Sequence, residues 1–359
     1  MRIVIALGGQ ALLWRTAPMT AEVQGRNARI AARAIAPLAA EHSIVVVHGN
    51  GPHVSPLTLQ AGSHPGAEPY PLDVLEAGHQ GMIGYLIQKE LRNLLPPLTP
   101  VATVLTMITV DPDDPAFARP STFVGPVYHQ DASDTLAAKR GWTFRRDGTA
   151  WRRVVPSPEP RQILEIQPIT WLLQHGAVVV CAGGGGMPSV HPTLSPGVLA
   201  GQESVIDKDL AGAMLAEAVG ADLFLMATDI DGVYLRWGTA EQRRLGHVTP
   251  GELAGYRFAS GSMGPKVEAA VRFATKTGNR AAIGALADIP GIVAGRAGTN
   301  VIMRSGLRTT VPAASGGGVT ADTVPAVTAV TAGTEAGEAT PRRTWNPARR
   351  GPGPMAGAG

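Results

Sequence analysis

One local pattern recurs three times in this chain and constrains its fold more than any other feature. A short run of mainly β-branched apolar residues, at 3–7, 44–47 and 178–181, is followed within two residues by a glycine-rich turn and then by a helical pattern. Continuous apolar runs without polar alternation are typical of strands buried on both faces of a parallel sheet. The pattern therefore predicts an α/β fold in which these strands share one sheet.

Helical patterns separate these strands, and a fourth apolar run at 223–226 precedes the TDIDG segment at 228–232. The helical patterns cover 20–41, 74–94, 159–175, 208–219 and 265–277. Strands and helices in alternation predict an open, mainly parallel sheet sandwiched by helices and connected by right-handed crossovers. The glycine-rich turns then gather at the carboxyl edge of the sheet, where open parallel sheets bind ligands.

Two segments depart from this alternation. Within 111–158 the Asp147-Gly148 pair lies between two runs that contain aromatic and basic residues, which predicts a hairpin. We interpret 111–158 as a small protruding lid subdomain. From 305 to 359 the chain is rich in Gly, Ala, Thr and Pro and has almost no large apolar residues. Such a composition predicts a disordered tail, so the folded domain is expected to span residues 1–304.

Composition excludes several classes of protein. No apolar stretch reaches the ~18 residues that a membrane span needs, and Gly8-Gly9 interrupts the apolar start of the chain. The net charge of +3 comes from arginines spread thinly, without the basic block typical of nucleic-acid binding. The single cysteine, Cys181, cannot form an internal disulfide, and the nine histidines lack metal-ligand spacing. We therefore expect a cytoplasmic protein with no nucleic-acid or membrane partner and no protein-held metal.

The glycine-rich turns favour a phosphate ligand. Such a turn after a strand exposes successive backbone N–H groups, and the following helix adds its positive end. Three of these turns at one sheet edge predict phosphate binding more strongly than one would. No G-x-G-x-x-G follows the first strand and no G-x-x-x-x-G-K-[ST] occurs, so neither a dinucleotide-binding fold nor a P-loop is supported.

The positions of the lysines are informative about the reaction, because the chain has only five of them. Phosphoryl transfer needs positive charge and an organising carboxylate near the phosphate. Lys208 stands at a predicted helix start where Asp207 can cap the helix and Asp209 can pair with the lysine. Lys266 follows a Gly-Pro pair at another predicted helix start. We interpret these two lysines as functional and the others as solvated. The others are Lys89, Lys139 and Lys276.

Several longer motifs carry a resemblance to a known family. They are ALGG at 6–9, VVHGNGP at 46–52, PLDV at 71–74, QGMIGY at 80–85, WRRVVPSPEP at 151–160, VVCAGGGG at 179–186, VIDKDLA at 205–211, TDIDGVY at 228–234 and GSMGPKVEAA at 261–270. With these motifs the chain resembles the carbamate kinases of the amino acid kinase superfamily, from Met1 to about Met303. The resemblance implies the amino acid kinase fold and a cytoplasmic homodimer that uses ATP or ADP with Mg²⁺.

The resemblance also implies roles for individual residues. Lys208 would neutralise the transferring phosphate, Asp209 would orient the lysines, and Lys266 would bind the nucleotide phosphates. The implied catalytic residues are Gly9, Asn50, Lys208, Asp209 and Lys266. The implied substrate-binding residues are Gly8, Gly49, Gly51, Gly184, Gly185 and, at a variant position, Thr122. The implied nucleotide-binding residues are Lys208, Thr228, Asp229, Asp231, Tyr234, Met263, Gly264 and Lys266. No residue is assigned as a metal ligand.

Some positions depart from the family pattern. Gln10 replaces an asparagine, and His53 and Ser55 replace a glutamine and a glycine. Thr122 stands where the family has a lid lysine, and a hydroxyl cannot supply the positive charge that would hold an anionic carbamate. Arg119 lies three residues earlier and offers a planar guanidinium in place of a point charge.

These observations support one leading function and leave two alternatives open. The leading function is reversible phosphoryl transfer between ATP and carbamate, giving carbamoyl phosphate and ADP and run towards ATP. One alternative keeps the transfer machinery but uses a different small carboxylate-like acceptor. The other is a weakly catalytic nucleotide-binding protein. The presence of Lys208, Asp209 and Lys266 favours an active enzyme over the last.

Overall fold

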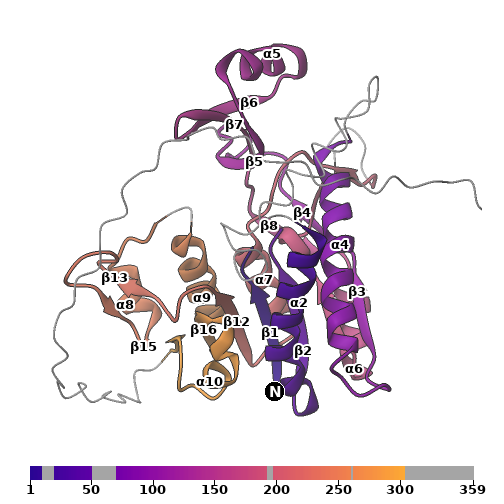
Figure 1. Cartoon of the computed structure of the whole chain (residues 1–359), viewed down its shortest axis with the longest axis vertical. Helices are drawn as coiled ribbons and strands as arrows, with labels where there is room; N and C mark the ends of the chain where they lie inside the picture. The colour runs from indigo at the N-terminus through magenta and orange to yellow at the C-terminus, as the bar shows by residue number, and fades with distance from the viewer. Residues whose placement is uncertain (10–19, 51–69, 192–196, 260–261, 304–359) are drawn as a thin grey trace, which may run out of the picture. The chain divides into compact units, whose positions relative to one another are not determined.

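The computed structural model describes residues 1–9, 20–50, 70–191, 197–259 and 262–303 (Figure 1). The chain divides into two compact units, Met1–Thr309 and Thr310–Gly359, and all described residues belong to the first. The segment predicted to be a disordered tail, 305–359, lies outside the described residues, as do Gln10, Gly51, His53 and Ser55.

An eight-stranded sheet forms the centre of the first unit, with strand order β15-β17-β16-β12-β1-β2-β9-β3 (Figure 1). Its strands are β1 (Arg2–Leu7), β2 (Ser43–His48), β3 (Val101–Val104), β9 (Val178–Cys181), β12 (Leu223–Thr228), β15 (His247–Val248), β16 (Arg280–Ala285) and β17 (Thr299–Val301). Neighbouring strands run parallel except for β16 and β17. The predicted open, mainly parallel sheet is confirmed, and the four strands predicted from apolar runs are its neighbours β12, β1, β2 and β9.

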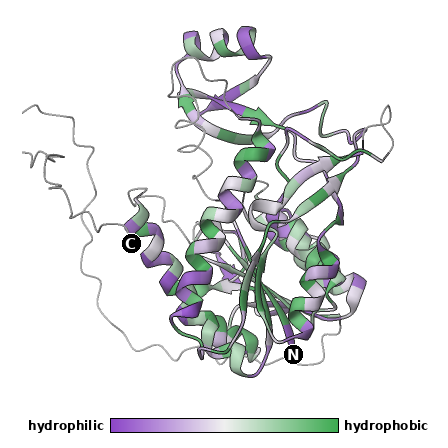
Figure 2. Ribbon diagram, turned by 90° about the vertical axis from the view of Figure 1, so that its right-hand side faces the viewer, coloured by the Kyte–Doolittle hydropathy of each residue, from purple (hydrophilic) through white to green (hydrophobic). Residues whose placement is uncertain are grey.

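Helices cover both faces of this sheet because its strands are apolar on both sides. Ile3, Ile5 and Leu7 of β1 pack against helices on one face, whereas Val4 and Ala6 pack against helices on the other. The first face carries α2 (Ala21–Ile35), α4 (Leu72–Arg92) and α10 (Ile289–Val293). The second carries α6 (Ile166–Gln174), α7 (Lys208–Ala218), α8 (Pro250–Ala254) and α9 (Met263–Thr277). Figure 2 shows the apolar strands between these layers.

Most of the predicted helices are confirmed. The pattern at 20–41 forms α2 and the 3-10 helix η1 (Ala36–Ala40), and the patterns at 74–94, 208–219 and 265–277 form α4, α7 and α9. The prediction of a helix is wrong for the first part of the pattern at 159–175.

The first residues of the pattern at 159–175 form strand β8 (Pro160–Ile163), and α6 begins only at Ile166. β8 is an end strand of a second sheet, of order β11-β10-β4-β8. Its partners are β4 (Met107–Val110), β10 (Met187–Val190) and β11 (Ala200–Gly201). Only Ile163 of the PRQI strand is buried. A strand of four residues with one buried side chain shows no alternation of apolar and polar residues. The local sequence therefore does not distinguish β8 from the start of the helical pattern of α6.

The segment 111–158, which the sequence predicts to be a lid, contains a three-stranded antiparallel sheet of order β5-β7-β6. Its elements are β5 (Thr122–Tyr128), β6 (Thr143–Asp147), β7 (Ala150–Val155) and the helix α5 (Gln130–Arg140). Asp147 pairs with Ala150 across the turn, and Gly148 has a φ of 64°, so the predicted hairpin is confirmed. Val124 and Val155 of the lid form a small apolar cluster with Leu72 at the start of α4.

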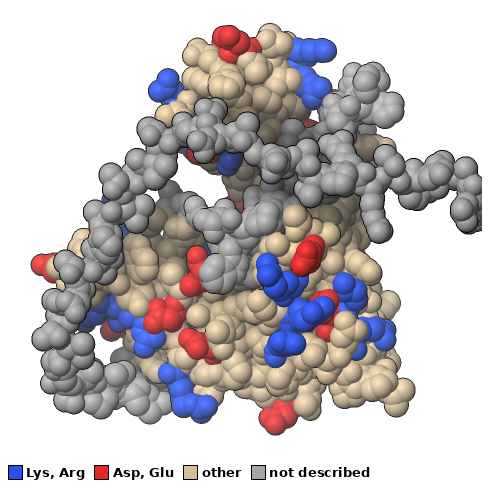
Figure 3. All heavy atoms as spheres, viewed as in Figure 1, with Lys and Arg blue, Asp and Glu red and all other residues tan. Residues whose placement is uncertain are grey.

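Charged side chains of both signs lie on the surface (Figure 3), and the single thiol is buried. Lys, Arg, Asp and Glu side chains are interspersed over the face shown in Figure 3. Cys181 at the end of β9 is 2% exposed, and its burial raises the pKa of its thiol. Among the described helices, none has the length and apolar character that crossing a bilayer requires.

Candidate active site

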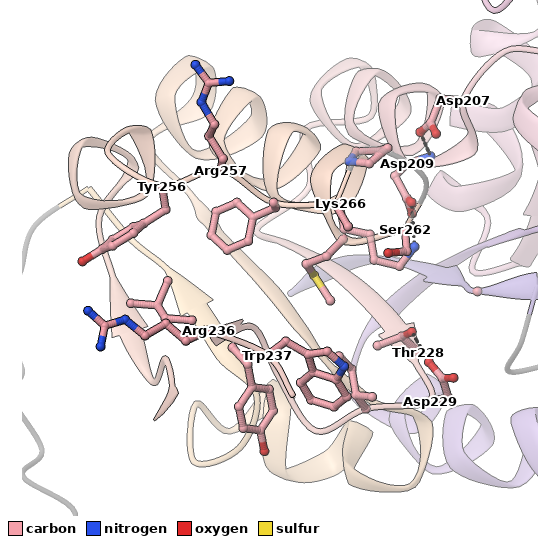
Figure 4. Close-up of a pocket in the computed structure, with 18 of the residues that line it drawn as sticks. Asp207, Asp209, Thr228, Asp229, Arg236, Trp237, Tyr256, Arg257, Ser262 and Lys266 are labelled. Atoms are coloured by element: carbon pink, nitrogen blue, oxygen red, sulfur yellow. Dashed lines mark hydrogen bonds and ion pairs between the residues drawn. The ribbon is translucent and has the colours of Figure 1, made fainter. Parts of the chain in front are cut away.

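A cavity of about 1140 Å³ opens at the carboxyl ends of β1 and β12. It is lined by segments that the chain order separates widely. They are Gly8-Gly9 after β1, Asp207–Asp209 at the start of α7, Thr228–Ile230 after β12, residues 234–237, Glu241, Arg243, residues 256–259, and residues at the start of α9. Figure 4 shows Asp209 and Lys266 at one end of this cavity and Arg236 and Tyr256 at the other. Its place agrees with the sheet edge where the sequence predicted a ligand.

Two lysines and one carboxylate form the polar end of the cavity. Asp209 binds the Lys208 ammonium through Oδ1 and accepts from the Lys266 ammonium through Oδ2 at 2.9 Å. Asp207 caps α7 by accepting from the backbone N–H groups of Asp209 at 2.8 Å and Leu210 at 3.1 Å. The cap fixes the first turn of α7, and with it the two side chains that follow it. Two cations on one anion leave a net positive charge.

Burial and charge act in opposite directions on these groups. Burial opposes ionisation of Asp209, but the charges of Lys208 and Lys266 outweigh it and hold the pKa of Asp209 below its usual range. Burial lowers the pKa of Lys208, and the charge of Lys266 adds to this, although Asp209 favours the ammonium form. Burial and the neighbouring Asp209 charge raise the pKa of Asp207. A phosphate entering the cavity would meet a desolvated cation, for which it is a strong partner.

The first two glycine turns lie against each other beside Lys208. A Cβ on Gly49 would lie 2.9 Å from the Gly9 nitrogen and 3.1 Å from Cδ of Lys208, so only glycine allows this approach. The Gly8 amide donates to the Ala227 carbonyl at 2.8 Å and the Gly49 amide donates to the Leu7 carbonyl at 3.0 Å. These two amides therefore hold the turns together across the strands and are already engaged.

The other residues predicted on the substrate side lie behind the cavity wall. Asn50 is buried and touches Gly184, whose φ is 68°, and a Cβ on Gly184 would lie 2.1 Å from the Asn50 amide nitrogen. Gly185 touches the backbone of Ile206, the residue before the Asp207 cap. The structure thus brings Asn50, Gly184 and Gly185 close to the turns without exposing them in the cavity. Gly51 is outside the described residues.

On the nucleotide side the predicted residues are divided. Thr228, Asp229, Tyr234 and Met263 line the cavity together with Lys208 and Lys266. Asp231 does not line it but accepts from the Tyr234 hydroxyl at 2.7 Å and pairs with Arg244 at 3.1 Å. Gly264 lines a neighbouring apolar groove beside α8 and α9, which shares Tyr256, Phe258 and Pro265 with the cavity.

The prediction missed the aromatic and basic end of the cavity. Trp237, Tyr256 and Phe258 line it, as do Arg236, Arg243 and Arg257. The Trp237 and Tyr234 rings meet edge to face with centroids 5.1 Å apart. The signal available in the sequence was the aromatic Tyr256-Arg257-Phe258 run just before the glycine-rich start of α9. This run has no helical or strand periodicity that would indicate a role, because its residues belong to no helix or strand.

The lid residues stand apart from this cavity. Thr122 is half-buried on β5, where it pairs in register with Val155, and Arg119 is exposed in the preceding turn. Neither lines the cavity. The lid is tied to the body through Arg153, whose guanidinium binds Glu203, while Glu203 also accepts from the Leu72 amide at 3.2 Å.

Comparison with known proteins identifies the family. Residues 1–284 match the model of the amino acid kinase family. The chain is 54% identical over 299 residues to the carbamate kinase of Rhizobium meliloti, covering 83% of this chain and 92% of the relative. It is 49% identical over 305 residues to the carbamate kinase of Haemophilus influenzae, covering 85% and 98%.

A solved structure agrees with these sequence relatives. The carbamate kinase of Giardia lamblia bound to AMP-PNP superposes with a TM-score of 0.79 at 34% identity, covering 84% of this chain and 98% of that one. The chain therefore belongs to the amino acid kinase family and, within it, to the carbamate kinases.

Proposed function

We propose that this protein is a carbamate kinase that transfers a phosphoryl group reversibly between ATP and carbamate, forming carbamoyl phosphate and ADP, and that it runs towards ATP. The observation that carries the proposal is the pairing of Lys208 and Lys266 on Asp209 at the polar end of the cavity. Relatives named as carbamate kinases at about half identity support the choice of carbamate as acceptor.

The chemistry follows from the charges. Phosphoryl transfer passes through a transition state whose charge is spread over the equatorial oxygens, so catalysis is mostly positioning and charge stabilisation. Lys208 and Lys266 supply two ammonium groups, and Asp209 fixes their positions without cancelling both charges. Because Lys208 also touches Gly49, it lies between the nucleotide side of the cavity and the turn after β2. It is therefore the group best placed to contact the phosphoryl group during transfer.

The nucleoside would occupy the other end of the cavity. Tyr234, Trp237, Tyr256 and Phe258 offer aromatic surface there, which suits the flat faces of a purine. Arg236 and Arg243 add positive charge near the same rings. The Giardia lamblia relative is a carbamate kinase bound to AMP-PNP, which supports a nucleotide as a ligand of this chain.

Mg²⁺ is part of the proposal as a companion of the nucleotide. Within the described ranges no group of three His, Cys, Asp or Glu side chains could hold a metal ion. Mg²⁺ in kinases is held largely by substrate phosphates and water, with one or two protein carboxylates. Asp229 is exposed on the cavity wall and Asp207 lines it as well. Asp229 fits a phosphate-bound Mg²⁺, which would neutralise charge on the phosphates, whereas Asp207 already caps α7 through Oδ1.

A homodimer and a cytoplasmic location belong to the same proposal. Both are supported by the membership of the chain in the carbamate kinases, and the single buried cysteine agrees with a reducing compartment.

The direct test is ATP formation from carbamoyl phosphate and MgADP by the purified protein, followed by luminescence. This direction avoids free carbamate, which is unstable. We expect ATP formation that depends on both substrates and disappears in the Lys208→Ala protein, which serves as the control for contaminating kinases. A protein that binds MgADP but forms no ATP from carbamoyl phosphate would overturn the proposal and favour a different acceptor.

Replacing Thr122 with lysine tests the acceptor side. We expect Thr122→Lys to lower the KM for carbamoyl phosphate about tenfold, because a hydrogen bond to a charged group contributes roughly 1.5–3 kcal/mol. The KM for MgADP should stay the same. The matched control is Thr135→Lys, which adds the same charge on the exposed side of α5 in the lid. Equal effects of the two substitutions on carbamoyl phosphate would mean that position 122 does not reach the substrate.

A further inference from the structure

A buried carboxyl group lies behind the turn that follows β2. Glu76 stands in the second turn of α4 and is 1% exposed. Its Oε2 accepts a hydrogen bond from Nδ2 of Asn50, the second residue after β2. Neither Glu76 nor this bond was expected from the sequence, and the transfer chemistry described above does not use Glu76.

Asn50 is held on its other sides by glycine. Gly184 leaves room for the Asn50 carboxamide that any Cβ would fill, since that Cβ would lie within 2.5 Å of Nδ2, Cγ and Oδ1. The neighbouring Gly49 touches both Gly9 and the Lys208 side chain. The Asn50 carboxamide is therefore fixed between α4 and the glycine turn after β9, and its neighbour in the chain, Gly49, contacts the Lys208 side chain.

Two polar atoms of this pair have no hydrogen-bond donor among the described residues. They are Oδ1 of Asn50 and Oε1 of Glu76, both buried, and Asn50 itself is 8% exposed. A buried oxygen without a hydrogen-bond donor is unfavourable, and a donor that reaches it stabilises the site. Within the described part of the chain, the Asn50 oxygen is therefore an acceptor that is open to a substrate N–H group.

The protonation state of Glu76 matters for an anionic substrate. Burial raises its pKa to about 8, and the Asn50 hydrogen bond opposes this only partly. The titratable groups on the surrounding elements are His48 at the end of β2, Lys208 at the start of α7 and several residues of α4, whereas the glycine turn after β9 has none and neither has β10. Those of α4 are Asp73, His79, Tyr85, Lys89, Glu90 and Arg92. At pH 7 the Glu76 carboxyl is mostly neutral and does not repel an anion beside Asn50.

We propose that Glu76 is a positioning residue that selects a substrate with an amino group. By accepting from Nδ2, Glu76 fixes the orientation of the Asn50 carboxamide and leaves Oδ1, which can only accept, for the substrate. Asn50 does not line the cavity, so the substrate amino group reaches this buried oxygen past the Gly49 turn, beside Lys208. The amino group of carbamate or carbamoyl phosphate donates N–H bonds, whereas the methyl group of acetate or acetyl phosphate does not. The inference rests on the proposed function and adds to it the basis of its acceptor choice.

Three variants test the inference. Glu76→Leu removes the acceptor, so Asn50 can turn over. Glu76→Gln keeps a carbonyl oxygen for Nδ2 but cannot ionise. Glu90→Gln is the matched control. Glu90 is another buried glutamate of α4, near the end of that helix and far from Glu76, and it pairs with Arg29 of α2. For each protein we would measure kcat and KM for carbamoyl phosphate, acetyl phosphate and MgADP between pH 6.5 and 9.

The expected results separate positioning from general damage. Glu76→Leu should lose about tenfold in its preference for carbamoyl over acetyl phosphate, as expected for about 1.4 kcal/mol from one hydrogen bond, with the KM for MgADP unchanged. Glu76→Gln should keep the preference. Wild-type activity should fall about tenfold from pH 7 to pH 9, because a group with a pKa near 8 is mostly ionised at pH 9, whereas Glu76→Gln should not show this fall. Glu90→Gln should behave as the wild type.

Other outcomes would overturn the inference. If the wild-type protein makes ATP and the Glu76→Leu protein keeps the full preference for carbamoyl over acetyl phosphate, then Glu76 does not determine which substrate is accepted. If Glu76→Leu does not fold, the Glu76→Gln profile decides, and a fall with pH equal to that of the wild type rejects the role of Glu76. A wild-type protein that makes no ATP from either acyl phosphate overturns the proposed function and this inference together.

Discussion

The Lys208→Ala protein is expected to form ATP at least about a thousandfold more slowly than the wild type while it remains folded. Removing a preorganised charge from a transferring group costs roughly 10²–10³ in rate or more, and here the lost ammonium touches both Asp209 and the Gly49 turn. The fold should survive because Asp209 keeps its partner Lys266 and Asp207 keeps its cap. Luminescence assays and thermal unfolding would measure the two properties on the same preparation.

The matched control for this result is Lys276→Ala. Lys276 lies on α9 with 67% of its side chain exposed and pairs with Glu217 at the surface. Surface pairs of this kind contribute about 0–1 kcal/mol, so neither rate nor stability should change by much. A folded Lys208→Ala protein with the wild-type rate would show that the phosphate is neutralised elsewhere.

The Gly185→Ala protein is expected to lose about 3 kcal/mol or more of its free energy of unfolding, together with most of its activity. The φ of Gly185 is 102°, a conformation that L side chains rarely adopt, and an added Cβ would lie 2.1 Å from the Ile206 carbonyl oxygen. Because Ile206 precedes the Asp207 cap of α7, relief of the clash would move Lys208. Roughly 2–4 °C per kcal/mol for a domain of similar size gives a fall in Tm of about 10 °C.

Gly176→Ala separates the clash from the backbone conformation. Gly176 also has a positive φ, 75°, but no atom lies within 4 Å of the position of its Cβ. Only the cost of the left-handed conformation remains, about 1 kcal/mol. Equal losses of stability in the two alanine proteins would mean that the turn after β9 yields easily and does not position α7.

The strands could be predicted because they are buried on both faces. β1, β2, β9 and β12 carry unbroken apolar runs, and such runs occur where helices cover both sides of a sheet. The strand β8 could not be predicted, since three of its four residues lack full burial and its structure depends on pairing with the distant β4. Tertiary contacts decided that segment, and local sequence carries little record of them.

The candidate site shows the same division. Lys208, Asp209 and Lys266 were predictable because they stand at helix starts in a chain with few lysines. Glu76 was not, because a glutamate on a helix is usually exposed and its spacing looks ordinary. Its burial results from the approach of the glycine turn after β9, which a reading of α4 alone cannot foresee. The wall of Trp237 and Tyr256 was missed since loops carry no period.

The burial of Cys181 has a practical consequence for spectroscopy. The only thiol of the chain lies at the end of β9 with a raised pKa, so it presents little thiolate to alkylating dyes. A cysteine that replaces Asp134, which is exposed on α5, would then be the single reactive thiol, and Cys181 need not be removed. A fluorophore attached there would report on the environment of the lid during turnover, in an otherwise unaltered protein.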